Sequence, residues 1–231
     1  MIPAFLGRDF YLLSCLKKAM NNIPKLLLYS MSLTEKHYAA LEKLTGKKAN
    51  DIYFACIENA ADVIEGSEQW VPGIRQSLVD RGYRVETIDL RNWFQKPEGL
   101  YKKLQSKDVI WVCGGHTYYL RWILKESGAD TIIKELVAAG KVYAGWSAGA
   151  IMAGPTTKYF ELMGDDPAAA AELIDAGLNL TNKVIVPHIN NPDFAAGAAA
   201  TCEALQHTGF KVIALNDHEA FLIHGATETL L

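Results

Sequence analysis

The chain has 231 residues, of which 50% are hydrophobic and 21% are charged, and its formal net charge is −3 at pH 7. This composition is typical of a globular protein large enough to bury a substantial core. The small negative charge gives no electrostatic reason to expect nucleic acid or an acidic membrane as a partner, and no stretch approaches the roughly 18–20 uninterrupted apolar residues of a membrane span.

Residues 1–24 come before the first regular pattern of the chain. Arg8 and Asp9 interrupt their apolar character before it could form the core of a secretory signal. We predict either an N-terminal extension or an additional helix that docks on the surface, and the sequence is compatible with both.

The cysteines are scattered and show no C-x-x-C spacing; they are Cys15, Cys56, Cys113 and Cys202. Two of them lie in apolar runs, where a reduced cysteine behaves as a small hydrophobic residue. We therefore expect a reducing compartment, the cytoplasm, with neither a disulfide framework nor a zinc site.

From Lys25 onward, short β-branched or aromatic runs alternate with longer helical segments. Strands are predicted over residues 26–31, 51–57, 83–88, 109–113, 142–145, 184–187, 212–215 and 221–223. Helices are predicted over residues 34–44, 67–80, 117–126, 131–139, 167–176 and 192–207. The run 109–113 is continuously apolar, which indicates a strand covered on both faces and a mostly parallel sheet flanked by helices on both faces. Without a repeat or linker, residues 25–231 are predicted to form one α/β domain.

The segment Gly145-Trp146-Ser147-Ala148-Gly149 follows one of these strands and precedes a small apolar helix. Glycines two before and two after the serine allow a sharp strand-to-helix turn that exposes the serine Oγ, while the helix N-terminus offers free N–H groups to an oxyanion. G-x-S-x-G alone is a common turn pattern. Whether Ser147 is a nucleophile or an ordinary turn residue therefore depends on which residues follow the other predicted strands.

Three further strand ends carry residues suited to the same chemistry: His188, Asp217, and the pair Gly114-Gly115. The carboxyl ends of parallel strands meet at one edge of a sheet. A serine nucleophile needs a base and an acid that orients the base, and a glycine turn can supply an oxyanion donor. Each residue alone has an ordinary structural explanation, and His218 and Glu219 compete for the base and acid roles. Their joint occurrence at strand ends favours a catalytic site.

The chain order Ser, His, Asp disfavours the α/β-hydrolases, in which the acid precedes the histidine. There is no Walker loop, H-E-x-x-H pair or G-x-G-x-x-G motif, so a nucleotide or metal enzyme has little support.

These residues resemble the peptidase E (aspartyl dipeptidase) family, which has a class I glutamine amidotransferase-like (flavodoxin-like) fold. In this family a serine occupies the sharp strand-to-helix turn, called the nucleophile elbow. The resemblance runs from about Leu26 to the end and is carried by residues 112–120, 145–150, 186–188 and 215–217. It implies Ser147 as nucleophile, His188 as base and Asp217 or Glu219 as acid. It also implies that the N–H groups of Gly115 and Ala148 form the oxyanion hole, and that Gly114, His116 and Thr117 contact substrate. Cys113 and His116 depart from the glycine and asparagine of the family's turn.

The resemblance favours a cytoplasmic serine-type exopeptidase that cleaves small peptides through an acyl-enzyme, with dipeptides bearing N-terminal aspartate as the expected substrates. It implies no metal or other cofactor, and we expect a monomer or a homodimer. An aspartate side chain would need a cation. Arg121 is nearest in sequence, although a solvated arginine on a helix face is the favoured alternative. Residues 165–175 resemble a lid beside the nucleophile.

Two other functions remain open. One is a hydrolase of the same fold that acts on another amide or ester, like a cyanophycinase. The other is a catalytically silent amidotransferase-like binding domain, which the joint retention of Ser147, His188 and Asp217 disfavours. A glutaminase would resemble a Cys-His-Glu site, and the serine at the elbow argues against it.

Overall fold

The computed structural model describes residues 23–231, so the prediction for residues 1–24 lies almost wholly outside the described residues. A seven-stranded sheet has the order β3-β2-β4-β5-β1-β8-β9. Its strands are β1 (Lys25–Tyr29), β2 (Tyr53–Ile57), β3 (Arg84–Thr87), β4 (Val109–Val112), β5 (Val142–Trp146), β8 (Ala220–His224) and β9 (Thr227–Leu230). The first five in spatial order are mutually parallel, and β8 and β9 are antiparallel to their neighbours. The predicted mostly parallel sheet is confirmed.

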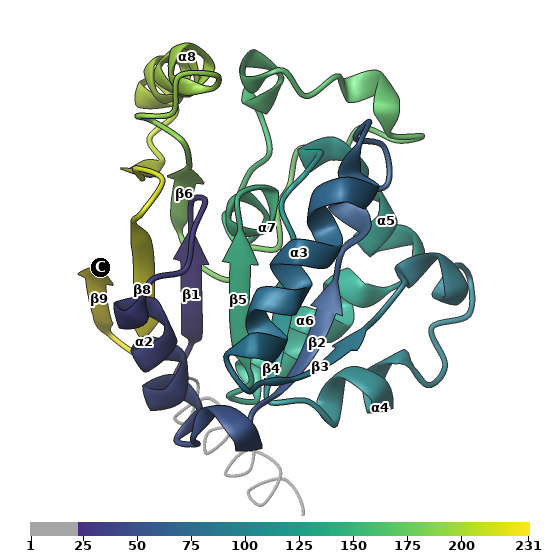
Figure 1. Ribbon diagram of the computed structural model, residues 1–231. Helices are drawn as coiled ribbons and strands as arrows, with labels where there is room; N and C mark the ends of the chain where they lie inside the picture. Colours follow the sequence, from purple (N-terminus) through teal and green to yellow (C-terminus); the bar gives the residue numbers. More distant parts are fainter. Residues whose placement is uncertain (1–22) are drawn as a thin grey trace, which may run out of the picture.

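Helices cover both faces of this sheet (Figure 1). On one face lie α2 (Glu35–Thr45) and α3 (Ser67–Asp80). On the other lie α4 (Leu100–Gln105), α5 (Thr117–Glu126), α6 (Ala129–Ala138) and α7 (Ala148–Met152). Strand β1 shows why two cores form: Leu27 packs toward α2, whereas Leu26 and Leu28 pack toward α5 and α6, because successive side chains of a strand point to opposite faces.

A separate parallel pair, β6 (Lys183–Val186) and β7 (Lys211–Ala214), stands beside the main sheet. In Figure 1, α8 (Ala195–Gln206) and the segment between α7 and β6 lie above the carboxyl ends of the strands. This segment, residues 155–177, is anchored on two sides. The Tyr118 hydroxyl of α5 accepts the N–H of Glu161 at 3.1 Å, and Thr201 of α8 donates to the carbonyl of Tyr159 at 3.0 Å. The carboxyl edge of the sheet is therefore roofed.

Strand β9 and helix α4 are not predicted by the sequence patterns. Strand β9 has four residues, all exposed, and pairs only at the edge with β8, so it has no apolar alternation to detect. Helix α4 has six residues, of which only Leu100 and Leu104 are buried. The helices predicted from residues 131 and 192 begin at Ala129 and Ala195.

The predicted helix over residues 167–176 is wrong. Only a 3₁₀ turn, Pro167–Ala169, forms there. Beyond this turn the chain is bound to other segments: the carbonyls of Ile174 and Asp175 accept hydrogen bonds from Thr157, and that of Ala176 accepts one from Arg121. Tertiary partners therefore outweigh the local helical preference of this alanine-rich stretch.

Within the described part of the chain, no helix has the length and apolar character needed to cross a membrane. The cysteines placed by the structure, Cys56, Cys113 and Cys202, are free thiols.

Candidate active site

Ser147 occupies a strained corner between β5 and α7. Its φ of 48° and ψ of −111° lie outside the regions that non-glycine residues ordinarily adopt. The N–H of Ser147 donates to the carbonyl of Tyr29 at 3.0 Å, and its own carbonyl accepts from Ala150 at 2.8 Å. A Cβ on Gly145 would lie 2.4 Å from the carbonyl oxygen of Gly149, so the corner can close only with glycine there. The backbone thus presents the Oγ of Ser147 at the roofed edge of the sheet.

His188 and Asp217 complete a linear array with this serine. The Nε2 of His188 lies 2.8 Å from the Oγ of Ser147, and its Nδ1 lies 2.8 Å from the Oδ1 of Asp217. Both distances are within the hydrogen-bonding reach expected of a nucleophile, a base and an orienting acid. Glu219 faces away, because its Oε2 accepts the N–H of Asn216 at 2.8 Å.

Ser30, Asn190 and Asn191 support the array, although no sequence motif indicates them. The Oγ of Ser30 accepts the N–H of His188 at 2.8 Å and lies 3.2 Å from its Nδ1. Asn191 donates to the Oδ2 of Asp217, and Asn190 accepts the N–H of Asp217, each at 2.8 Å. Ser30 directly follows the apolar strand β1, so its position at a strand end was the available signal.

Burial and hydrogen bonding shift the pKa values of His188 and Asp217 in opposite directions. Burial lowers the pKa of His188 below its ordinary value, and the neighbouring Asp217 only partly offsets that effect. Burial raises the pKa of Asp217, but hydrogen bonds from His188 and Asn191 outweigh it, so this pKa is lowered. Near neutral pH the imidazole is therefore uncharged and the carboxylate ionised, which is the state a general base requires.

The pH dependence of kcat/KM is expected to reflect the lowered pKa of His188. A neutral imidazole accepts a proton and a protonated one does not, so activity should fall as the pH drops through the pKa of the free enzyme. The midpoint of this acidic limb should lie below about 6.5, the ordinary histidine value. Initial rates at substrate concentrations well below KM, measured between pH 4 and 8, test this. An acidic limb centred above the ordinary histidine value would contradict it.

The turn after β4 lies against the serine. A Cβ on Gly114 would be 3.0 Å from the Cβ of Ser147, and one on Gly115 would be 2.3 Å from the carbonyl oxygen of Ala60. Gly115 also has a φ of 140°, which disfavours any side chain. Among residues 23–231, the N–H groups of Gly115 and Ala148 have no hydrogen-bond acceptor. Both are thus available to an oxygen atom beside Ser147.

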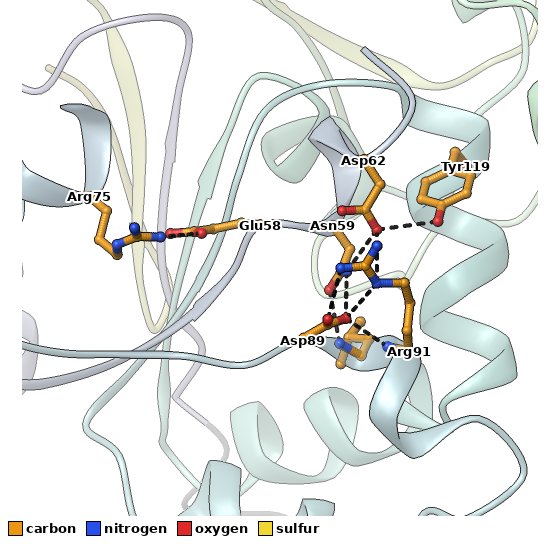
Figure 2. Close-up of polar contacts among 8 residues, drawn as sticks. Glu58, Asn59, Asp62, Arg75, Asp89, Arg91 and Tyr119 are labelled. Atoms are coloured by element: carbon orange, nitrogen blue, oxygen red, sulfur yellow. Dashed lines mark hydrogen bonds and ion pairs between the residues drawn. The ribbon is translucent and has the colours of Figure 1, made fainter. Parts of the chain in front are cut away.

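A polar network holds the short 3₁₀ segment Asn59–Ala61 against which this turn packs (Figure 2). The side chain of Asn59 donates to Asp62 at 2.9 Å and to Asp89 at 3.0 Å, and accepts the N–H of Leu90 at 2.9 Å. Arg91 bridges the two carboxylates, 2.8 Å from Asp89 and 3.6 Å from Asp62. Since the N–H of His116 donates to the carbonyl of Ala60 at 2.8 Å, the network fixes the position of the glycine turn.

A cavity of about 440 Å³ opens beside Ser147 and His188. Most of its wall is apolar, including Trp70, Ile74, Ile151, Phe160, Met163 and Phe194. Gly114 and Thr117, for which substrate contact is predicted, also line it, as does the predicted oxyanion donor Gly115. His116 does not line it: this side chain is buried and caps α5 by accepting the N–H of Tyr119. Of the lid-like segment expected over residues 165–175, Asp165 lines the cavity, and Phe160 and Met163 from the preceding residues line it as well. The part of the chain that covers the cavity therefore begins earlier than expected.

Arg121 is neither in the cavity nor solvated. Its guanidinium donates to the carbonyl of Ala176 at 2.6 Å and pairs with Asp130 at 3.2 Å. The two side chains of the pair are only 8% and 14% exposed. Both interpretations offered for Arg121 are therefore wrong, because the folded segment 155–177 covers this face of α5.

Replacing Arg121 with alanine is expected to lower the free energy of unfolding by about 3–5 kcal/mol, because it leaves the largely buried carboxylate of Asp130 without its cationic partner. Urea denaturation followed by circular dichroism measures this. Lys47→Ala is the matched control, since Lys47 and Asp108 form a pair in which the lysine is 43% exposed; a loss below about 1 kcal/mol is expected there. Equal losses in the two variants would contradict the structural role of Arg121.

Across residues 23–231, no three His, Cys, Asp or Glu side chains are grouped so that they could hold a metal ion. The fold is a class I glutamine amidotransferase-like α/β fold with a serine at the strand-to-helix corner. The chain belongs to peptidase family S51, whose sequence pattern matches residues 26–231.

Individual relatives agree with this assignment. An uncharacterized peptidase of Listeria monocytogenes, Lmo0363, is 32% identical over 167 residues, which cover 71% of this chain and 79% of the relative. Peptidase E of a Nostoc species is 30% identical over 118 residues, which cover 51% of this chain and 45% of the relative. The crystal structure of a candidate peptidase E from Listeria monocytogenes superposes with a TM-score of 0.75 at 28% identity, covering 90% of this chain and 98% of that one. The chain is thus a peptidase E-like protein.

Proposed function

We propose that the protein is a serine peptidase that cleaves small peptides through Ser147, His188 and Asp217. The observation that carries this proposal is the continuous array from the Asp217 carboxylate through His188 to the Oγ of Ser147, with both gaps at 2.8 Å. Membership of peptidase family S51 supports the same reaction class.

In the proposed mechanism, the Oγ of Ser147 attacks the scissile carbonyl carbon while the Nε2 of His188 takes the hydroxyl proton. The N–H groups of Gly115 and Ala148 bind the resulting oxyanion. His188 then gives its proton to the leaving amine as the C–N bond breaks, which leaves an acyl-enzyme on Ser147. Water attacks the ester, His188 takes a proton from it, and the collapse of the second intermediate returns this proton to the serine. Asp217 keeps the Nδ1 of His188 protonated throughout.

The roofed cavity favours short peptides over folded proteins. Residues 155–177 and α8 cover the carboxyl edge of the sheet, whereas an extended substrate would need an open groove to reach Ser147. We therefore propose an exopeptidase acting on di- or tripeptides. Dipeptides with N-terminal aspartate, the substrates of the aspartyl dipeptidases, form one arm of the test.

A dipeptide library, with released amino acids quantified by chromatography, tests the peptidase activity. Labelling with a fluorophosphonate, followed by peptide mass spectrometry, tests the nucleophile independently of substrate preference. We expect a single modified serine, Ser147, and loss of labelling in His188→Ala. Labelling elsewhere, or none, combined with no hydrolysis of any dipeptide, would exclude the proposed function.

A further inference from the structure

The charge on the cavity wall is unusual for a site that would bind an acidic side chain. Among the residues that line the cavity in the described part of the chain there is no lysine or arginine, and Asp165 is the one carboxylate. His188, the other titratable group there, is neutral near pH 7 because burial lowers its pKa. The cavity is therefore apolar with a single negative charge.

Asp165 is attached to the turn that carries the proposed oxyanion donor. Its Oδ2 accepts the N–H of Thr117 at 2.8 Å, two residues beyond Gly115. The α-ammonium of an N-terminal residue is two bonds from the scissile carbonyl carbon, so a group that binds it has to lie close to the oxyanion donors. Asp165 satisfies this requirement and keeps a second oxygen, for which no partner is found within residues 23–231.

Thr117 provides a second polar group at the same place. Thr117 lines the cavity and is only 1% exposed, and its Oγ1 has no hydrogen-bond partner among the described residues. A buried hydroxyl without a partner is costly in a closed structure. A ligand that donates a hydrogen bond would satisfy both Thr117 and the free oxygen of Asp165.

We propose that the cavity accepts a peptide whose N-terminal residue has a large apolar side chain, with its free α-ammonium bound by Asp165 and Thr117. This proposal rests on the peptidase function proposed above. The apolar wall of Trp70, Ile74, Phe160 and Met163 then contacts the side chain, and a volume of about 440 Å³ is sufficient for leucine or phenylalanine. An N-terminal aspartate is disfavoured, because its side-chain carboxylate would lose hydration without gaining a cation and would lie in the same cavity as Asp165.

The direct test compares four substrates that all release alanine: Leu-Ala, Phe-Ala, Asp-Ala and N-acetyl-Leu-Ala. We expect kcat/KM for Leu-Ala and Phe-Ala to exceed that for Asp-Ala by at least about tenfold, the usual scale of discrimination by an apolar pocket. Acetylation removes the ammonium charge, so N-acetyl-Leu-Ala should be cleaved about 100-fold more slowly than Leu-Ala, the scale for losing one partner of a buried charged pair.

Asp165→Asn separates binding of the ammonium from support of the turn, because the amide oxygen can still accept the N–H of Thr117. We expect this variant to lose most of the difference between Leu-Ala and N-acetyl-Leu-Ala, mainly through slower cleavage of Leu-Ala. Asp166→Asn is the matched control, since Asp166 is exposed, caps Pro167–Ala169 and does not line the cavity. It should keep the wild-type difference.

Fluorophosphonate labelling of Ser147 distinguishes a failure of the specificity proposed here from a failure of the peptidase function on which it rests. If Ser147 is labelled and Asp-Ala is the fastest substrate, or if acetylation has no effect, the specificity proposed here is wrong while the peptidase function stands. An unchanged preference in Asp165→Asn, with labelling intact, would also exclude Asp165 as the ammonium ligand. Absence of labelling in the wild-type protein would overturn the peptidase function and this inference together.

Discussion

Ser147→Ala is expected to lower kcat by about 10⁶-fold, the usual cost of removing the nucleophile of a triad that acts as a unit. The substitution removes only the Oγ, whose hydrogen-bond partner is His188. Alanine keeps the Cβ that lies against Gly114, and the backbone strain at φ 48° is the same for both residues. Stability should therefore change little while the reaction stops, and hydrolysis of the fastest dipeptide in the library measures the loss.

Ser106→Ala is a suitable control for this experiment, because Ser106 is exposed at the end of α4 and its hydroxyl only contacts the carbonyl of Lys103. It should keep wild-type activity. If Ser147→Ala retained more than a few per cent of the wild-type kcat, attack by its Oγ could not be the route of catalysis.

Asp217→Asn is expected to lower kcat by about 10⁴-fold, because it reverses the tautomer of the base. The Oδ2 of Asp217 accepts a hydrogen bond from the side-chain amide of Asn191. An asparagine at position 217 would direct its carbonyl oxygen to that donor and its NH₂ group to the Nδ1 of His188. The proton of the neutral imidazole then sits on Nε2, which can no longer accept the proton of Ser147.

Glu219→Gln provides the matched carboxylate control. The side chain of Glu219 accepts the N–H of Asn216, and a glutamine can do the same, so activity close to wild type is expected. A large loss in Glu219→Gln with little loss in Asp217→Asn would assign the acid to Glu219 instead. Steady-state kinetics on both variants, with thermal unfolding to verify folding, decides between the two.

The placement of Ser147, His188 and Asp217 could be predicted because it depends on strand ends. Each residue follows an apolar run, and the carboxyl ends of β5, β6 and β7 meet on one side of the fold, although β6 and β7 form a sheet of their own. The choice between Asp217 and Glu219 could not be made in this way, since the two residues are only two positions apart. Their orientation depends on the turn 216–219, in which Asn216 engages Glu219, and on Asn190 and Asn191 from another segment.

Local sequence determined the apolar strands and the glycine-flanked corner at Ser147, because the signal for each lies within a few consecutive residues, and these motifs were sufficient to indicate the family. Tertiary contacts decided the rest. No helix continues beyond Ala169, and the carbonyls of residues 174–176 bond instead to Thr156, Thr157 and Arg121. Arg121 is buried because this segment covers it. The character of the cavity depends on side chains as distant in sequence as Met31 and Phe194. A local pattern carries no information about which of them meet, because packing across the whole fold brings them together.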